Sequence, residues 1–139
     1  MPFVLEPHVA GELGIGTRLD PTVHPPQIDA VEYVLDSPSA DDLIESFPVF
    51  LVSEELGTRH EAAKLHGFAL ADADVVASPE YRAAYGAAPP KPYRWLRIQP
   101  TPVADCWTDR TGRLCVSDRM MRVLQQADLS NCEIEPLPA

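Results

Sequence analysis

One short phrase occurs twice in this chain, and each copy stands in the same setting. Val52-Ser53-Glu54 follows an apolar run, and Val116-Ser117-Asp118 follows Leu114-Cys115. In both places a strand pattern leads into a helical pattern, and a second strand pattern comes after it. Serine is preferred at the position before a helix, and acidic side chains favour the first helical turn. The repetition predicts two β-α-β units, at approximately residues 47–76 and 113–135.

Two such units can place two helices on one face of a shared sheet. We therefore expect an α+β fold with a mixed, mainly antiparallel sheet of about five to seven strands. The two helices of the duplicated β-α-β unit should pack mainly on one face of this sheet. The chain has 139 residues, which fits a single domain over residues 1–139 that buries about two thirds of its unfolded surface.

Fifteen prolines separate the expected elements, because proline cannot donate to a strand ladder. Strand patterns cover Ala30–Asp36, Phe47–Val52, Phe68–Val76 (with a turn inside it), Tyr93–Ile98, Leu114–Val116 and Cys132–Ile134. Helical patterns cover Glu54–Leu65, Pro79–Tyr85 and Met120–Ala127, and Ser37–Glu45 is expected to hold a turn and a short helix capped by Ser39. We expect Leu56 and Ala63 to face the sheet, Gly67 to stop the helix before it, and Asp109–Gly112 to form a hairpin turn. Gly11–Pro26 lacks an apolar period and is expected to be an irregular loop.

The net charge of −10 is concentrated in the first part of the chain. Residues 1–60 contain two basic and eleven acidic side chains, whereas residues 61–139 contain nine and ten. Such a surface repels nucleic-acid phosphates and anionic lipids, so neither a nucleic acid nor a membrane is an expected partner. It favours a basic protein partner, whose association it would accelerate. The alternative is that the acidic side chains only keep the protein soluble.

The strongest candidate site is an acidic cluster on both sides of the expected central strand. Paired carboxylates can bind a partner, act as an acid and base, bind a divalent metal ion, or cap a helix. No histidine accompanies either pair, so we expect partner binding and predict neither a catalytic residue nor a metal ion. The predicted partner-binding residues are Asp41, Asp42, Glu45, Glu54 and Glu55.

Other signatures of chemistry are weak. The four histidines lack zinc spacing, and the three cysteines form no C-x-x-C pair, which suits structural thiols in a reducing compartment. Gly11-x-x-Gly14-x-Gly16 is not preceded by a strand or followed by a lysine, so it predicts no bound nucleotide and no cofactor. No apolar run approaches the roughly 20 residues of a membrane span, and the first residues do not resemble a secretory signal. We expect a cytoplasmic protein.

Aromatic and basic residues are interleaved only between Tyr81 and Arg97. Such mixtures can stack on single-stranded nucleic acid, but the net charge of −10 opposes this. We expect Arg94 and Arg97 to pair with acidic residues of the first half instead, and Trp95 to pack in the core or against a sheet edge.

Four segments carry a resemblance to a known group of proteins. These are His24-Pro25-Pro26, Asp41–Pro48 continuing into Leu51–Glu54, Tyr93–Leu96 and Leu114–Arg119. Together they resemble small uncharacterised bacterial α+β proteins, some of which are similar to immunity proteins of polymorphic toxin systems. The resemblance implies a cytosolic binder that acts as an antidote to a toxin, and it implies no catalytic residue.

Three hypotheses follow. The first is a non-enzymatic protein-binding domain that neutralises a basic partner through its acidic surface, as a monomer or weak dimer. The second is a small enzyme with a site around Thr17, Asp20 and His24. The third is a structural subunit that self-associates through an edge strand or an aromatic patch near Tyr93 and Trp95.

Overall fold

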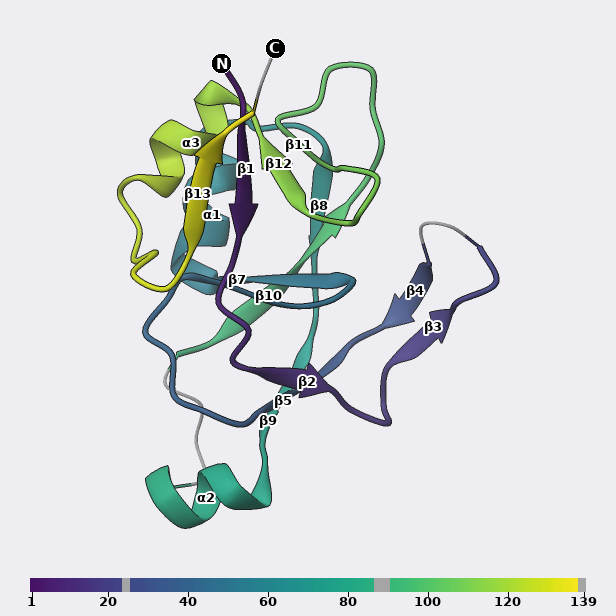
Figure 1. Ribbon diagram of the computed structural model, residues 1–139, viewed down its shortest axis with the longest axis vertical. Coiled ribbons are helices and arrows are strands. Elements are labelled where there is room, and N and C mark those ends of the chain that lie inside the picture. The colour runs from purple at the N-terminus through teal and green to yellow at the C-terminus, as the bar shows by residue number, and fades with distance from the viewer. Residues whose placement is uncertain (24–25, 87–90, 138–139) are drawn as a thin grey trace.

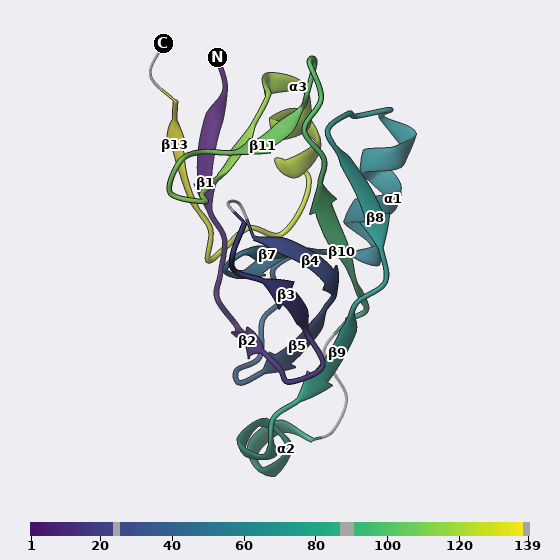
Figure 2. The same cartoon turned by 90° about the vertical axis from the view of Figure 1, so that its right-hand side faces the viewer.

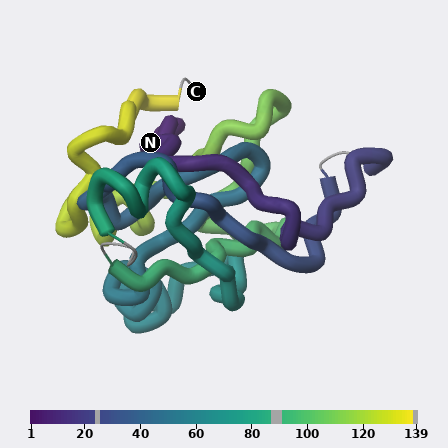
Figure 3. The backbone as a smooth tube through the Cα atoms, turned by 90° about the horizontal axis from the view of Figure 1, so that it is seen from below, coloured from purple at the N-terminus to yellow at the C-terminus, as the bar shows by residue number. Residues whose placement is uncertain are grey.

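A computed structural model describes residues 1–23, 26–86 and 91–137 of the chain. The described residues form three helices and thirteen strands, and the strands are divided among four sheets (Figure 1). Pro2 and Leu137 lie side by side near the two chain ends, where the Leu137 N–H donates to the Pro2 carbonyl oxygen at 2.8 Å (Figures 1 and 3).

Sheets A and B each contain four antiparallel strands. Sheet A has the order β11 (Cys106–Thr108), β12 (Leu114–Val116), β1 (Phe3–Glu6) and β13 (Glu133–Pro136). Sheet B has the order β6 (Leu43–Ser46), β7 (Val49–Ser53), β10 (Tyr93–Ile98) and β8 (Phe68–Ala71). In sheet B, β7 and β8 lie on either side of β10, and in sheet A, β12 and β13 lie on either side of β1.

Sheets C and D are smaller. Sheet C has the order β2 (Gly11–Leu13), β5 (Glu32–Leu35) and β9 (Asp74–Ala77), and its β5–β9 pair is parallel. Sheet D is a hairpin of β3 (Arg18–Asp20) and β4 (Gln27–Ala30), which projects from the body of the protein (Figures 1 and 3).

Each helix begins at a serine whose hydroxyl accepts the N–H of the third residue along. The helices are α1 (Glu54–Ala62), α2 (Pro79–Tyr85) and α3 (Asp118–Leu124), capped by Ser53, Ser78 and Ser117. Helices α1 and α3 contact each other near the end of the molecule that holds sheet A, and α2 lies at the opposite end (Figures 1 and 2).

Two groups of buried apolar side chains form the interior. One group joins β1, β12, α1 and α3, and includes Leu5, Leu56, Leu114 and Met120. The other joins sheet C, α2 and the opposite side of sheet B, and includes Tyr33, Leu51, Tyr81 and Trp95. Every residue of β7 is buried, because its alternate side chains enter both groups.

The α+β class and the mainly antiparallel strand pairing are confirmed. Strands dominate, and they occupy four sheets rather than one. The predicted bounds of Pro79–Tyr85, Tyr93–Ile98 and Leu114–Val116 are those observed. The predicted turn within Phe68–Val76 separates β8 from β9, and Asp109–Gly112 joins β11 to β12 as predicted.

The predictions for two segments are wrong. Ser37–Glu45 contains no helix; its second half enters β6, because Leu43 and Ile44 are buried against neighbouring strands. Gly11–Pro26 is not simply irregular, since it contains β2 and β3. At Gly11 a Cβ would lie 1.9 Å from the Val34 carbonyl oxygen, so only glycine fits beside β5 there.

The helix after β7 ends three residues earlier than the prediction. Lys64 takes a positive φ of 55°, which ends the helical path before Gly67 is reached. Ala63 is exposed, so its predicted position towards the sheet is wrong. Leu56 is buried as predicted, and the fourth residue after it, His60, is buried beside it on the same helical face.

Candidate functional site

Asp41 lies wholly inside the protein, with 0% of its surface exposed. Its carboxylate accepts two hydrogen bonds of 3.0 Å from Asn131, one from the backbone N–H and one from the side-chain amide. The Tyr93 hydroxyl donates to the Asp41 carbonyl oxygen at 2.8 Å. Asp41 therefore ties the start of β6 to β10 and to the loop after α3. The expectation that this carboxylate faces outward is wrong.

Asp42 is also committed to internal contacts. Its carboxylate accepts the Asp128 N–H at 2.7 Å and lies 3.0 Å from the Lys91 ammonium group. Burial alone would raise its pKa, but hydrogen bonds from Asp128, Ser53 and Lys91 lower the pKa below its ordinary value. Asp42 is therefore ionised and paired, and it joins three segments that are distant in sequence.

Glu45 lies apart from these two residues, on β6. Burial raises its pKa to about 7, and the nearby charge of Glu6 adds to this effect. Glu6 is paired in register with Glu133, and a hydrogen bond with Glu6 and its charge raise the pKa of Glu133 as well. Glu6 on β1 therefore lies close to both Glu45 on β6 and Glu133 on β13.

Glu54 and Glu55 are exposed in the first turn of α1. Glu55 accepts a hydrogen bond of 2.6 Å from Arg59, four residues along the helix. Of the five predicted partner-binding residues, only Glu54 and Glu55 are exposed. The five carboxylates therefore lie in three separate settings: a buried loop, a half-buried strand and a helix start.

An acidic surface that no local sequence pattern predicted lies on the outer side of sheet C. Tyr33 and Leu35 are buried at alternate positions of β5, so Glu32 and Val34 face the opposite side. The strand register places Glu12 beside Val34, Glu32 beside Asp74, and Val34 beside Val76. We call this surface the acidic sheet face; its residues are Glu12, Glu32, Val34, Asp74 and Val76.

On the acidic sheet face, Val34 and Val76 lie side by side, Glu12 of β2 lies next to Val34, and Glu32 and Asp74 stand two residues before the valines on β5 and β9. Glu12 and Asp74 are exposed, while Glu32, Val34 and Val76 are half-buried. The Gly16 N–H donates to the Glu32 carboxylate at 3.3 Å. The signal for this surface was the alternation of Glu32 and Val34 with Tyr33 and Leu35, but the pairing with β2 and β9 could not be deduced from it.

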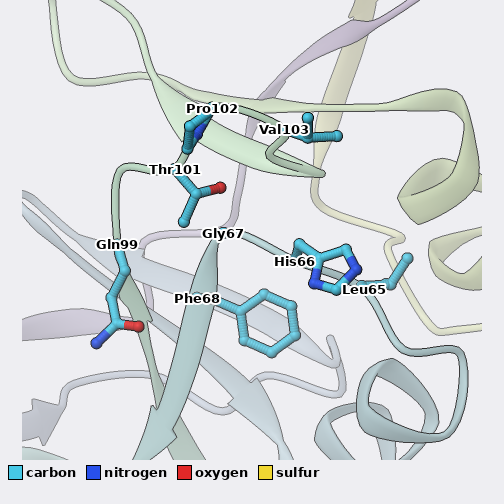
Figure 4. A pocket seen from close by; sticks show the side chains of 8 residues that line it. All are labelled: Leu65, His66, Gly67, Phe68, Gln99, Thr101, Pro102 and Val103. Atoms are coloured by element: carbon cyan, nitrogen blue, oxygen red, sulfur yellow. The ribbon is translucent and has the colours of Figure 1, made fainter.

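An open groove lies between the start of β8 and the loop after β10 (Figure 4). Its volume is about 530 Å³, and Phe68, Gln99, Thr101 and Val103 are among the residues that line it. His66 is the one titratable side chain in this lining, so the groove has no acid–base pair.

A second groove, which we call the Trp95 groove, has a volume of about 550 Å³ and mainly apolar walls. It lies between β4, the turn before β7, β10 and the turn after β11. Arg97 and Arg110 are its two basic lining residues.

The predicted enzyme site falls partly within the described residues. The Thr17 hydroxyl donates to the Glu32 carbonyl oxygen and accepts the Glu32 N–H, both at 3.0 Å. The Asp20 carboxylate accepts the Thr22 hydroxyl and N–H at 2.6 and 2.9 Å, and these bonds lower its pKa. His24 lies outside the described residues. Both Thr17 and Asp20 are therefore used in local backbone structure.

The expectation of an exposed aromatic patch at Tyr93 and Trp95 is wrong, because these residues are only 6% and 5% exposed. Arg97 stacks over the Trp95 ring, 5.2 Å from its centroid. Arg94 donates to the Leu70 carbonyl oxygen at 3.4 Å. Neither arginine forms an ion pair within the part of the chain that is described, so their expected pairing with acidic residues is also wrong.

His60 is an unusual feature of the interior. It is 0% exposed, and neither ring nitrogen has a hydrogen-bond partner among the described residues. Its ring centroid lies 5.8 Å from that of Phe68. Burial lowers the pKa of His60 to about 4, so the ring is neutral at physiological pH.

Across residues 1–23, 26–86 and 91–137, no group of three or more His, Cys, Asp or Glu side chains is arranged to hold a metal ion. In the same ranges, no helix has the length and apolar character needed to cross a membrane. The chain matches no protein-family model, no curated protein and no solved structure.

Proposed function

We propose that this protein is a non-enzymatic binding protein that captures a basic protein partner on its acidic sheet face, as an immunity protein captures a toxin. The observation that carries the proposal is that Glu12, Glu32 and Asp74 border the half-buried pair Val34 and Val76 on one face of sheet C. Protein interfaces commonly combine apolar side chains with polar or charged ones at their border.

The overall charge supports the same partner chemistry. A net charge of −10 attracts a basic protein over a distance set by salt screening, and it accelerates the encounter. Asp41 and Asp42 contribute to this field, but their side chains hold the fold together. Glu54 and Glu55 at the exposed start of α1 form a second candidate contact patch.

We also propose that the scaffold is a structural repeat. The segment β7–α1–β8 places its two strands on either side of β10, and β12–α3–β13 does the same around β1. The helix of each segment starts at a serine that bonds the third residue along. A shared arrangement of this kind supports duplication of one β-α-β unit.

We propose that the protein acts as a monomer in the cytoplasm. Its edge strand β13 carries Glu133 and Glu135, and charged side chains on an edge oppose strand addition by a second copy. Cys106, Cys115 and Cys132 are free thiols, which suits a reducing compartment.

The test compares charge reversals on different surfaces. The immobilised protein captures its partner from the source cell, and the purified pair is then followed by stopped-flow fluorescence at several salt concentrations. The double variant Glu12→Lys/Asp74→Lys should slow association about tenfold or more at low salt and flatten its salt dependence. Glu54→Lys/Glu55→Lys measures the contribution of the second patch.

A matched control is Glu61→Lys/Glu135→Lys, which changes the net charge by the same amount at exposed positions outside sheet C. It should slow association much less. If the control and the sheet variant slow association equally, net charge alone steers the partner and the assigned surface is wrong. If no basic protein is captured, the binding function itself is wrong.

A further inference from the structure

The Trp95 groove begins where two neighbouring strands of sheet B separate. Tyr93–Trp95 pair with β7, whereas Leu96–Ile98 pair only with β8 on the other side. The first residues of β7, Val49 and Phe50, pair only with β6, and they follow the Phe47-Pro48 turn directly. The space between β10 and this turn is the groove of about 550 Å³.

The walls of the groove are aromatic and aliphatic. Phe47 lines one side of the groove and is 57% exposed. Its ring packs on Gly112, where an added Cβ would lie 2.3 Å from the ring carbon Cε2. Trp95, Ile28 and Ile98 provide the other apolar surfaces.

The charge of the groove is opposite to that of the whole protein. Arg97 and Arg110 line it, and neither forms an ion pair among the described residues. Asp109 is the one acidic lining residue, and it is committed to Arg113 at 2.9 Å and to Thr111 at 2.8 Å. The two arginines therefore leave the groove with a positive charge in a protein of net charge −10.

We infer that the Trp95 groove binds a small apolar carboxylate, with its hydrocarbon or aromatic part between Phe47 and Trp95 and its carboxylate at Arg97 or Arg110. The volume lies within the range of small-molecule sites, which combine apolar walls with a few polar groups that orient the ligand. Arginine binds carboxylates through paired, charge-assisted hydrogen bonds. This inference goes beyond the proposed capture of a protein partner and uses a different surface.

An added peptide strand fits the groove less well. Leu96–Ile98 offer only three residues on the open edge of β10, whereas strands in globular proteins commonly have about five or six. The lining also comes from four separate segments around a concavity, which suits a compact ligand better than an extended one.

The test uses naphthalene-2-carboxylate and the uncharged naphthalene-2-carboxamide as probes of equal shape. Titration into the isotopically labelled protein, followed by two-dimensional NMR, should shift the Trp95 indole and the Ile98 and Gly112 amides in a saturable way. The carboxylate should bind about tenfold more tightly than the carboxamide, because only the carboxylate forms charge-assisted bonds with arginine. Arg97→Gln with Arg110→Gln should remove this preference while carboxamide binding persists.

Arg122→Gln is the matched control, since Arg122 is an exposed arginine of α3 that does not line the groove. It should leave both affinities unchanged. The inference is overturned if no saturable shift occurs, if both probes bind equally, or if Arg122→Gln weakens the carboxylate as much as the groove variants do. Shifts of the same amides with protein concentration alone would assign the groove to a second copy, and binding of an acidic peptide in place of the carboxylate would assign it to a peptide.

Discussion

At the scale of single residues, the interior formed by the described residues contains one side chain whose polar atoms are left without hydrogen bonds. His60 places two ring nitrogens in the core without a hydrogen-bond partner among the described residues. A buried polar group without a partner costs about 1–3 kcal/mol of stability. His60 was not singled out by its sequence setting, because its burial depends on how α1 packs.

We predict that His60→Leu raises the free energy of unfolding by about 1–2 kcal/mol at pH 7. The folded pKa of His60 is about 4, below its ordinary value of 6.5, so only the unfolded chain takes up a proton between these values. The contribution of His60 to wild-type stability should therefore fall as pH drops from 6.5 towards 4, by up to about 3 kcal/mol, and His60→Leu should remove this part of the pH dependence. Urea denaturation at pH 7.5 and pH 5 measures both effects. Equal pH dependence of the variant and the wild type would contradict this prediction.

Glu45 has the opposite pH dependence. Its folded pKa of about 7 lies above its ordinary value of 4.5, so the folded protein holds a proton that the unfolded chain releases. Stability from this residue is present below pH 4.5 and is lost as pH rises through 7. Glu45→Gln should therefore stabilise the protein by up to about 3 kcal/mol above pH 7 and by little below pH 4.5.

The same denaturation experiment at pH 8 and pH 4 tests this. Glu55→Gln is the control, because Glu55 is exposed at the start of α1. If Glu45→Gln stabilised the protein equally at pH 8 and pH 4, the raised pKa of Glu45 would not be the cause of the gain in stability.

At the scale of elements, the three helix starts illustrate how local patterns succeed. Ser53, Ser78 and Ser117 accept the N–H groups of Leu56, Tyr81 and Met120 at 3.1, 3.0 and 3.2 Å. Serine caps act within a single turn, so a sequence of a few residues is sufficient to predict them. The Ser117 hydroxyl also donates to the Asp105 carboxylate at 2.7 Å. A capping pattern of a few residues does not predict this contact.

We predict that Ser117→Ala destabilises the protein by about 2 kcal/mol, whereas Ser78→Ala costs about 1 kcal/mol. Both variants lose a helix cap, but only Ser117→Ala also leaves the buried Asp105 carboxylate without one of its donors. Thermal unfolding of the two variants at the same pH gives the comparison. Equal losses would mean that the bond between Ser117 and Asp105 contributes nothing to stability.

Local patterns fail where the controlling contact is distant in sequence. Asp41 and Ser39 resemble a helix start, but the Asp41 carboxylate bonds Asn131, which is 90 residues away. The Ser39 hydroxyl bonds His8 at 2.8 Å instead of capping a helix. Segment 37–45 therefore takes the conformation that its distant partners require.

At the scale of the whole molecule, the acidic surface has a cost in stability. Glu32 and Asp74 are paired in register on β5 and β9, and like charges opposite each other destabilise a sheet. Surfaces used for binding commonly retain such unfavourable contacts, because they serve the partner rather than the free fold.

We predict that Asp74→Asn stabilises the free protein by about 0.2–1 kcal/mol at low salt. This gain in stability should shrink at high salt, because salt screens the repulsion between Glu32 and Asp74 in the unsubstituted protein. Chemical denaturation in buffers of low and high ionic strength measures the change. Asp72→Asn is the control, because Asp72 is exposed between β8 and β9 and is not paired with Glu32. If Asp74→Asn and Asp72→Asn changed the stability equally at both ionic strengths, the pairing of Glu32 with Asp74 would not destabilise the protein.

Strand alternation, serine caps, proline positions and the net charge were readable from the sequence, because each depends on neighbouring residues or on composition. They predicted the α+β class, β10, α2 and the turn before β12. The tertiary structure alone decided that Asp41 and Asp42 are structural, that Glu12, Glu32 and Asp74 share one face, and that Trp95 borders a groove. Those outcomes depend on strand register and burial, which are set by contacts between segments far apart in the chain.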